Sequence, residues 1–281
     1  MIDLHTHTTC SDGMDSPFTL VNKALSQGVT TLAITDHDSI AGWREATSAI
    51  RANLSLVPGA EISCLTDDGV SVHMLGLLFD GENVDMAAML EATRDGRIPR
   101  MKKMIELLNR DGIGVTMADV IAAMPEGATM GRPHLADALV NLKIISGRDA
   151  AFKDLLHNES KYYRSHAAPT PEAAIRQIRL AGGVAVIAHP FATHRGETIA
   201  ASTFASLVDA GLNGIEVDHR DQSEAERAAL RSIAQELDLV ITGSSDYHGS
   251  GKLNLLGENR THPAQWERLE AQANQRRVRQ A

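Results

Sequence analysis

Short apolar runs rich in β-branched residues alternate with amphipathic stretches along most of the chain, and this alternation constrains the fold more than any other feature. Strand–helix alternation is typical of a parallel sheet, and about seven such units favour a closed barrel over an open sheet. The predicted strands are Met1–His5, Thr31–Thr35, Leu54–Ser63 (broken at Pro58–Gly59), Val72–Leu78, Val184–Ala188, Gly214–Val217 and Leu239–Thr242. The predicted helices between them are Phe18–Gln27, Ile40–Ala52, Pro171–Leu180, Phe204–Ala210 and Glu224–Leu237.

The alternation stops between residues 81 and 167, where helical patterns follow one another without a convincing strand. This stretch is much longer than an ordinary connection, so we expect an inserted helical subdomain over the barrel mouth. The predicted barrel is therefore discontinuous and comprises residues 1–80 and 168–281. The helices predicted in the insert are Met86–Thr93, Pro99–Asp111, Met117–Met124, Pro133–Leu142 and Arg148–Leu155, and a polar helix is predicted over Ala264–Ala281.

The charge balance excludes several classes of partner. Lys+Arg 27 against Asp+Glu 36 gives a net charge of −9, which argues against generic binding to duplex DNA or to an anionic membrane. A small phosphorylated substrate held by a few local cations remains compatible with it. Cys10 and Cys64 are too few for a disulfide framework or a thiolate zinc site. The start of the chain lacks the basic and apolar regions of a signal peptide, so we expect a cytoplasmic protein with no membrane span and no stable DNA complex.

Histidines are unusually frequent, with 12 against three tyrosines and two tryptophans, and several of them lie where a predicted strand ends. Alternate residues of an extended chain point to the same side, so His5 and His7 can reach one ion. The carboxyl ends of parallel barrel strands form the face on which sites are built. The residues placed there are His5, His7 and Asp12 in DLHTHTTCSDG, His37 in TDHD, Glu61 in GAEIS, His189 in AHP, and Asp246 and His248 in DYH. His73 is an exception, because it begins its predicted strand.

A single histidine in an apolar run is more often a satisfied core residue than a ligand, and an isolated HxH pair can arise by chance. The convergence of so many imidazoles and carboxylates on one predicted face is not explained in that way. We therefore predict a polynuclear metal site. Its donors are nitrogen and oxygen only, which suits Mn²⁺, Fe²⁺ or Zn²⁺.

The order and spacing of these motifs resemble the PHP (polymerase and histidinol phosphatase) family of metal-dependent phosphoesterases. The matching residues are HTHTTCSDG at 5–13, TDHD at 35–38, Glu61, His73, AHP at 188–190 and DYH at 246–248. The resemblance covers residues 1–80 and 168–260 and implies a distorted (β/α)7 barrel. The insert, with GRPH at 131–134, resembles the stand-alone branch of the family. That branch is similar to phosphatases of nucleoside 3′,5′-bisphosphates, with exonuclease activity at RNA 5′ ends in relatives.

The resemblance also implies three divalent metal ions, with Mn²⁺ as the first choice and Fe²⁺ or Zn²⁺ as alternatives. His5, His7, Glu61 and Asp246 would hold the first ion. Glu61 would bridge to the second, which His73 and His189 complete. Asp12, His37 and His248 would hold the third. Asp36 and Asp38, which flank His37, are candidates for orienting these ligands, although Asp38 is equally well interpreted as a loop cap.

We expect a phosphomonoesterase that hydrolyses the 3′-phosphate of nucleoside 3′,5′-bisphosphates to the 5′-nucleotide and phosphate. A metal-bridging hydroxide held by Glu61 would attack, and His194 is the candidate acid for the leaving oxygen. The candidate substrate-binding residues are Arg132, His134, His194 and Arg44, with Arg195 as a further candidate for the remote phosphate. His157, His166, His219 and His262 fit no partner pattern and are predicted to lie at the surface.

Three alternatives remain open. Histidinol-phosphate phosphatase would need an acidic subsite for the substrate amine, whereas the insert supplies Arg132 and His134. A 5′–3′ exonuclease on short RNA or oligonucleotides is compatible with the same metals. A non-catalytic metal-bound interaction module would be favoured by degenerate ligands, but no ligand position is missing here.

Overall fold

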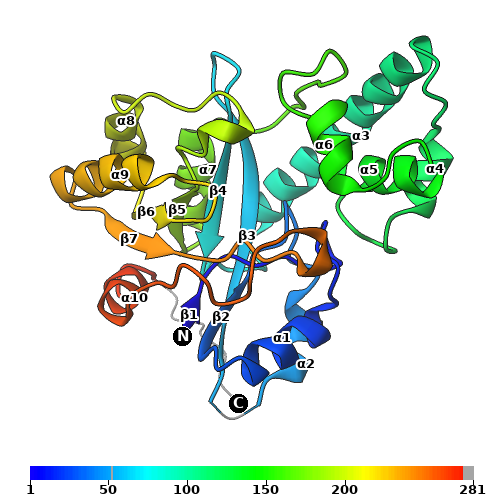
Figure 1. Ribbon diagram of the computed structural model, residues 1–281. Coiled ribbons are helices and arrows are strands. Elements are labelled where there is room, and N and C mark those ends of the chain that lie inside the picture. Colours follow the sequence, from blue (N-terminus) through cyan, green and yellow to red (C-terminus); the bar gives the residue numbers. More distant parts are fainter. Residues whose placement is uncertain (52, 275–281) are drawn as a thin grey trace.

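The structure is a computed structural model that describes residues 1–51 and 53–274. Seven strands form one sheet in chain order, and helices surround it (Figure 1). An isolated bridge between Thr6 and Tyr247 joins the segments that follow the first and last strands, so the sheet is nearly closed into a barrel. The predicted α/β barrel is thereby confirmed. The strands are β1 Ile2–Asp3, β2 Thr31–Ile34, β3 Ser55–Leu65, β4 Ser71–Leu77, β5 Val184–Ala188, β6 Gly214–Asp218 and β7 Val240–Gly243.

The helices around the barrel begin at residues that satisfy their free backbone N–H groups. The side chains of Ser16, Thr170 and Ser223 each accept a hydrogen bond from an N–H group in the first turn that follows. A proline occupies the first turn of two of these helices, where its missing N–H costs nothing. The helices are α1 Pro17–Ser26, α2 Trp43–Ala49, α7 Pro171–Leu180, α8 Thr203–Ala210, α9 Glu224–Glu236 and α10 Pro263–Glu270.

The direction of β4 differs from the prediction of a parallel sheet. β1–β3 and β5–β7 pair in parallel, but β4 is antiparallel to both of its neighbours. The reason is the connection: only residues 66–70 separate β3 from β4, and a parallel pair needs a crossover of a dozen residues or more. His73, at the start of β4, is paired with Ala188, the residue before His189. The start of β4 therefore lies beside the end of β5, and the apparent exception at His73 disappears.

β3 is continuous through the predicted break at Pro58–Gly59. Residues 55–58 of this strand pair with β2, and residues 59–65 pair with β4. Gly59 lies where the partner changes, and a Cβ there would come within 2.8 Å of Leu77 Cδ2 and 2.9 Å of the Gly76 carbonyl oxygen. Glycine is required by this close approach rather than by a turn. β3 extends beyond the end of β2, and β4 pairs with β5 only from His73 onward. The end of the β3–β4 hairpin, residues 64–72, therefore extends beyond both neighbouring strands, and it rises above the rest of the sheet in Figure 1.

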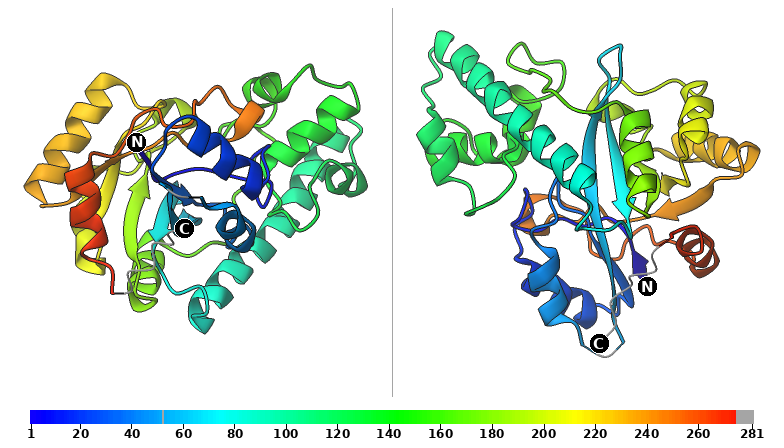
Figure 2. Two further views of the ribbon diagram at one scale, coloured as in Figure 1. Left: turned by 90° about the horizontal axis from the view of Figure 1, so that it is seen from below. Right: turned by 180° about the vertical axis from the view of Figure 1, so that it is seen from behind.

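The helices of the 81–167 segment surround an apolar cluster of their own, which includes Met104, Leu108, Leu135 and Leu139. They are α3 Val84–Arg110, α4 Met117–Ala122, α5 Arg132–Asn141 and α6 Arg148–Asp154. One helix, α3, replaces the two predicted before and after Pro99, which it contains without ending. Figure 2 shows α3 running from the barrel wall out to α4–α6. α3 contributes to this cluster and also to an apolar cluster of the barrel. The division of the chain into a barrel and an insert domain stays a prediction.

The remaining predicted helices are shorter in the structure. The stretch Ile40–Ala52 contains α2 over Trp43–Ala49, and residue 52 lies outside the described residues. The predicted C-terminal helix is observed as α10, and residues 275–281 lie outside the described residues. Within the described part of the chain, no helix combines the length and apolar character needed to cross a membrane.

Candidate metal centre

The predicted metal ligands come together at one end of the barrel. They follow β1, β2, β5 and β7, or lie within the β3–β4 hairpin. All of them are buried except His37 and His73, which are partly exposed. Because β4 is reversed, its beginning contributes to the same end at which the parallel strands finish. The residues brought together are His5, His7, Asp12, His37, Glu61, His73, His189, Asp246 and His248.

The carboxylate of Glu61 is at the centre of this group. Its Oε1 lies 2.8 Å from His73 Nδ1, and its Oε2 lies 2.9 Å from His37 Nδ1. Burial alone would raise the pKa of Glu61, but the charges of His73, His37 and His5 hold it well below its usual value. The carboxylate is therefore ionised and shared among imidazoles on both of its oxygens. Three further imidazoles lie within 3.3–3.4 Å of it, those of His5, His7 and His189.

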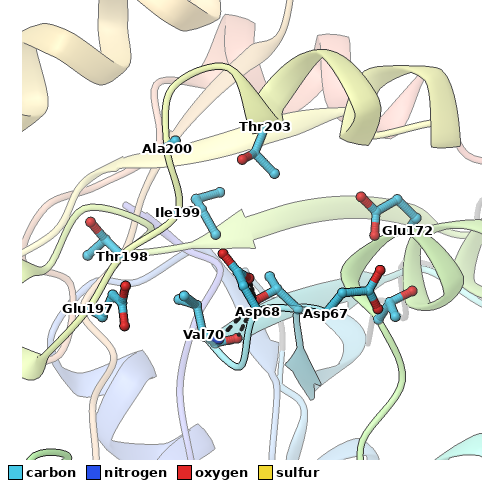
Figure 3. Close-up of a pocket in the computed structure, with 11 residues that line it drawn as sticks. Asp67, Asp68, Val70, Glu172, Glu197, Thr198, Ile199, Ala200 and Thr203 are labelled. Atoms are coloured by element: carbon cyan, nitrogen blue, oxygen red, sulfur yellow. Dashed lines mark hydrogen bonds between the residues drawn. The ribbon is translucent and has the colours of Figure 1, made fainter.

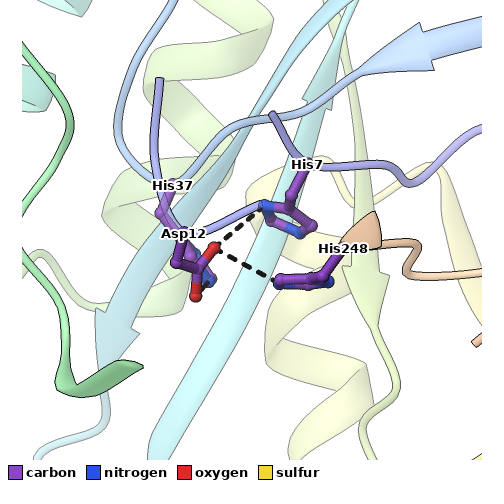
Figure 4. Close-up of side chains that lie close together, drawn as sticks. All are labelled: His7, Asp12, His37 and His248. Atoms are coloured by element: carbon purple, nitrogen blue, oxygen red, sulfur yellow. Dashed lines mark ion pairs between the residues drawn. The ribbon is translucent and has the colours of Figure 1, made fainter. Parts of the chain in front are cut away.

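A second group gathers around Asp12, with His7, His37 and His248 pointing toward its carboxylate (Figure 4). Asp12 Oδ1 lies 3.3 Å from His248 Nε2 and 3.7 Å from His7 Nδ1, and Asp12 Oδ2 lies 3.7 Å from His37 Nε2. Burial would raise the pKa of Asp12, but the charges of His248 and His37 hold it well below its usual value.

Three atoms of these groups test whether a metal ion fits. Asp12 Oδ1, His37 Nδ1 and His248 Nε2 are buried, and none makes a hydrogen bond within the part of the chain that the structure describes. Buried polar atoms without a hydrogen bond destabilise a protein unless something else satisfies them. One divalent cation would satisfy Asp12 Oδ1 and His248 Nε2, and another would satisfy His37 Nδ1 beside Glu61, because imidazole and carboxylate are the ordinary donors of such ions. The residues present therefore fit a metal centre.

Glu216, on β6, was missed from the sequence and orients two of the imidazoles. Its Oε1 lies 3.0 Å from His5 Nδ1, and its Oε2 accepts a hydrogen bond from the His189 backbone N–H at 2.9 Å. The first contact places the His5 proton on Nδ1 and leaves Nε2 facing Glu61. Carboxylates in this position fix the tautomer of a ligating histidine. The available signal was an acidic residue inside a buried strand, GIEVD.

The two carboxylate oxygens of Asp246 contact different groups. Its backbone adopts a left-handed conformation with φ +52. Its Oδ1 lies 3.4 Å from His7 Nε2. Its Oδ2 lies 2.8 Å from Arg195 Nη2, 2.9 Å from Lys252 Nζ and 3.4 Å from His219 Nε2. One oxygen of this carboxylate thus serves the imidazole cluster, and the other is surrounded by cationic and imidazole groups.

The prediction that His219 lies at the surface is wrong, because its side chain is fully buried against Asp246. Its Nδ1 accepts the Asp221 backbone N–H at 3.0 Å, so a neutral ring carries its proton on Nε2, toward Asp246. His219 follows the end of β6, as the predicted ligands follow theirs. Its position at a strand end was therefore the signal that could have found it.

Asp36 and Asp38 support the site from outside. Asp36 accepts hydrogen bonds from the Thr8 N–H at 2.7 Å and from Ser11 Oγ at 2.6 Å, which holds the loop that carries His7 and Asp12. Asp38 accepts from Arg97 Nε at 2.9 Å and Nη2 at 2.6 Å. The second aspartate thus joins α3 to the barrel.

A cavity of 560 Å³ lies between the metal centre and helices α3, α5 and α6. Its wall on the helical side is cationic. Arg97 and Arg100 of α3 face it together with Arg132 of α5. The Arg100 Nε is buried without a hydrogen bond, and neither Arg100 nor Arg132 pairs with a carboxylate among the described residues. Burial, with Arg132 and Arg97 nearby, lowers the pKa of Arg100 to about 9. Such crowded positive charge is stabilised by a bound anion.

Arg132, predicted to bind a phosphate, lines this cavity. Its Nη1 donates to the Leu156 carbonyl oxygen at 2.8 Å and to Asn158 Oδ1 at 2.6 Å, and its guanidinium lies over the Tyr163 ring at 4.9 Å. The sequence reasoning missed Arg97 and Arg100. Their signal was a run of arginines at a spacing of three, residues 94, 97 and 100, on one helix.

The structure does not bring the other predicted substrate residues together. His134 is buried, and its Nδ1 accepts the Gly131 N–H at 3.0 Å, which caps α5. Arg44 is exposed on α2 and does not line the cavity. His194 lines the cavity, with Nε2 lying 3.6 Å from Asp221 Oδ1. Arg195 lines it too and pairs with both Asp221 and Asp246.

Of the other histidines predicted at the surface, His157 and His262 are exposed, and His157 also lines the cavity. His166 is a correction, because it is half-buried in the cavity wall. Burial, with Arg97 and Arg100 nearby, lowers its pKa to about 2. Its ring is therefore neutral.

Comparison with known proteins is consistent with this geometry. The model of the PHP domain matches residues 3–128. A 5′-3′ exoribonuclease of Haemophilus influenzae is 35% identical over 259 residues, covering 92% of this chain and 93% of that protein. A 3′,5′-nucleoside bisphosphate phosphatase of Chromobacterium violaceum is 31% identical over 252 residues, covering 89% and 88%. A solved structure from Bifidobacterium adolescentis, assigned as a metal-dependent phosphoesterase, superposes with a TM-score of 0.90 at 39% identity and covers 96% of each chain.

Proposed function

The chain belongs to the PHP family of metal-dependent phosphoesterases, and from this premise we propose that it hydrolyses the 3′-phosphate of nucleoside 3′,5′-bisphosphates. The products are the 5′-nucleotide and inorganic phosphate. One observation carries the proposal: the cavity has an imidazole–carboxylate cluster at one wall and arginines without carboxylate partners at the other. A ligand with two separated phosphates matches both walls.

At the first wall, the predicted ligand sets would hold three ions, with Mn²⁺ as the first choice. Glu61 would be shared by two of these ions, a role supported by the imidazoles on both of its oxygens. Asp12, with His37 and His248, would hold the ion of the second group. When bound, divalent ions supply an activated water as the nucleophile and neutralise the charge of the phosphoryl group.

At the second wall, Arg100 and Arg132 would hold the 5′-phosphate. Guanidinium groups bind phosphate through two parallel N–H donors, and the phosphate charge would offset the crowding of Arg97, Arg100 and Arg132. His194 stands at the cavity and is the candidate proton donor. As the bond from phosphorus to the 3′-oxygen breaks, this oxygen takes the His194 proton, and the oxygen of water remains on phosphorus.

The same wall opposes histidinol phosphate, because its cationic amine would face arginines. A non-catalytic role is opposed by the complete set of ligand side chains gathered at the barrel end.

An exoribonuclease activity is the second candidate, since the same wall would accept a 5′-phosphorylated RNA end. A neighbouring pocket of 290 Å³ disfavours it (Figure 3). This pocket shares Glu197, Thr198 and Ile199 with the cavity, and Asp67, Asp68 and Glu172 also line it. Carboxylates there repel the remainder of a polyanionic chain. A single nucleotide is therefore favoured over RNA.

The test is phosphate release by Mn²⁺-loaded protein from adenosine 3′,5′-bisphosphate, L-histidinol phosphate and adenosine 3′-monophosphate, together with nucleotide release from a short 5′-phosphorylated RNA. We expect kcat/KM to be highest for the bisphosphate and about tenfold or more lower for the 3′-monophosphate, which lacks the group held by the arginines. A preference for histidinol phosphate or for RNA would replace the proposed substrate. No turnover of any of them by metal-loaded protein would contradict the enzyme assignment.

A further inference from the structure

Lys252 lies four residues after His248, and the proposed function gives it no role. It comes directly after the 3₁₀ turn η2, Gly249–Gly251, which itself follows Asp246 and His248. Its Nζ lies 2.9 Å from Asp246 Oδ2, and its side chain is 35% exposed and lines the cavity. An ammonium group therefore stands at the imidazole–carboxylate wall, opposite the arginines of α3 and α5.

The turn before Lys252 is held on both sides, so the lysine is presented by a fixed backbone. Gly249 has φ +68, and a Cβ at this position would lie 3.1 Å from Met14 Cβ. A Cβ at Gly251 would lie 2.5 Å from Arg148 Nη1. The left-handed backbone at Gly249 favours glycine, whereas the atom close to Gly251 is the end of the Arg148 side chain. On the far side of the lysine, Asn254 Nδ2 donates to the Ser245 carbonyl oxygen at 2.7 Å.

Most other cations of the cavity have their donors engaged elsewhere, each in an ion pair with a neighbouring carboxylate. Lys252 is ion-paired as well, with Asp246, but its Nζ makes one hydrogen bond within the described chain. An ammonium group has three N–H donors, so two remain for a ligand. The engaged pairs are Arg97–Asp38, Arg148–Asp137 and Arg195–Asp221.

We infer that Lys252 is a phosphate-binding residue of the catalytic centre, whose ammonium contacts the oxygens of the phosphoryl group being transferred and of the inorganic phosphate product. This role rests on the proposed function only in taking the transferred group to be a phosphoryl group. Asp246 holds the ammonium beside the metal centre, and the two free N–H donors face the cavity. The arginine wall and Lys252 then bind different phosphates of one substrate.

The experiment is a calorimetric titration of Mn²⁺-loaded full-length protein with inorganic phosphate, with the metal content of each sample measured in parallel. In Lys252→Met we expect the dissociation constant for phosphate to rise about tenfold or more, the size of effect that follows from losing a hydrogen bond to a charged group. The metal content should stay that of the wild type. Lys252→Arg keeps the charge and should remain within about threefold of the wild type, and Lys103→Met, on the exposed face of α3, is the matched control.

Turnover gives a second readout. Lys252→Met should lower kcat/KM by the same factor for adenosine 3′,5′-bisphosphate and adenosine 3′-monophosphate, because both carry the transferred phosphate. Unchanged phosphate affinity in Lys252→Met would overturn the assignment, and so would a loss of metal, which would make Lys252 a positioning residue for Asp246. If the wild type failed to hydrolyse the bisphosphate, the proposed function would fall, yet the phosphate titration would still decide the role of Lys252.

Discussion

The two walls of the cavity handle charge in opposite ways. At the barrel wall, every carboxylate of the cluster lies within 4 Å of an imidazole, and Glu61 alone is close to five of them. At the helical wall, Arg97 is paired with Asp38, but Arg100 and Arg132 have no carboxylate partner among the described residues. The first wall thus supplies both kinds of metal donor, whereas the second carries an unbalanced positive charge. Unbalanced charge beside a cavity indicates where an anionic ligand binds.

The largest loss of activity should come from substitutions at the barrel wall. In His7→Asn or Asp246→Asn we expect activity to fall at least about a hundredfold while the fold persists, because a metal donor is lost. Turnover, metal content and circular dichroism are measured together. His262→Asn, at an exposed position, is the matched control and should behave as the wild type. Unchanged turnover in both site variants would contradict the assignment of this wall.

The junction between the walls can be weakened at Asp38. Asp38→Asn keeps the shape but removes the charge that faces Arg97, so the free energy of unfolding should fall by about 2 kcal/mol. Chemical denaturation measures this change. Asp238→Asn, whose aspartate pairs with Arg268 at the surface, is the matched control and should change stability by less than about 1 kcal/mol. Equal effects of the two substitutions would mean that the buried Arg97–Asp38 pair contributes no more to the free energy of unfolding than a surface pair does.

At the helical wall, Arg132→Ala should raise KM for adenosine 3′,5′-bisphosphate about tenfold. KM for adenosine 3′-monophosphate should stay within about twofold of the wild-type value. The difference arises because only the bisphosphate carries the remote group. Steady-state kinetics on both substrates provides the measurement, with Arg44→Ala as an arginine control outside the cavity. An equal change for both substrates would remove Arg132 from this role.

The smallest effect is expected for Arg100→Met. Removing one of three crowded charges should leave the ligand-free protein as stable or more stable, by up to about 1 kcal/mol. The same variant should lose the stabilisation that adenosine 5′-monophosphate gives the wild type. Thermal unfolding with and without this nucleotide tests both statements. A clear destabilisation of ligand-free Arg100→Met would show that the positive charge of the helical wall is already compensated within the protein.

The two walls also differ in how far the sequence predicts them. The metal donors are local signals, because each follows or lies within a short strand that its own apolar pattern identifies. α7 and β5 were predicted at their observed bounds for the same reason, with Thr170 and Pro171 marking the start of the helix. The direction of β4 was missed although the sequence contains its signal, because the connection from β3 is too short for a parallel pair.

The arginine wall combines two residues of one helix with a third residue that is distant in the chain. Arg97 and Arg100 lie on α3, and Arg132 reaches them only through the packing of the helices around their own apolar cluster. His219 was missed although it follows the end of β6, because the sequence around it contains no partner for it and Asp246 lies 27 residues later. A position at a strand end identifies residues that the barrel brings together, whereas helix packing leaves no such local signal.

The end of the β3–β4 hairpin, which extends beyond both neighbouring strands, has a consequence for how this fold can diverge. Glu61 lies within β3 rather than at its tip, and the strand pair continues to residues 65 and 71 beyond it. The hairpin tip contributes Asp67 and Asp68 to the acidic pocket. A change in the length or the charge of this tip would alter which substrates reach the metal centre. The metal-binding side chains would keep their positions. Substrate range can therefore evolve by insertion and deletion at one turn, independently of the chemistry beneath it.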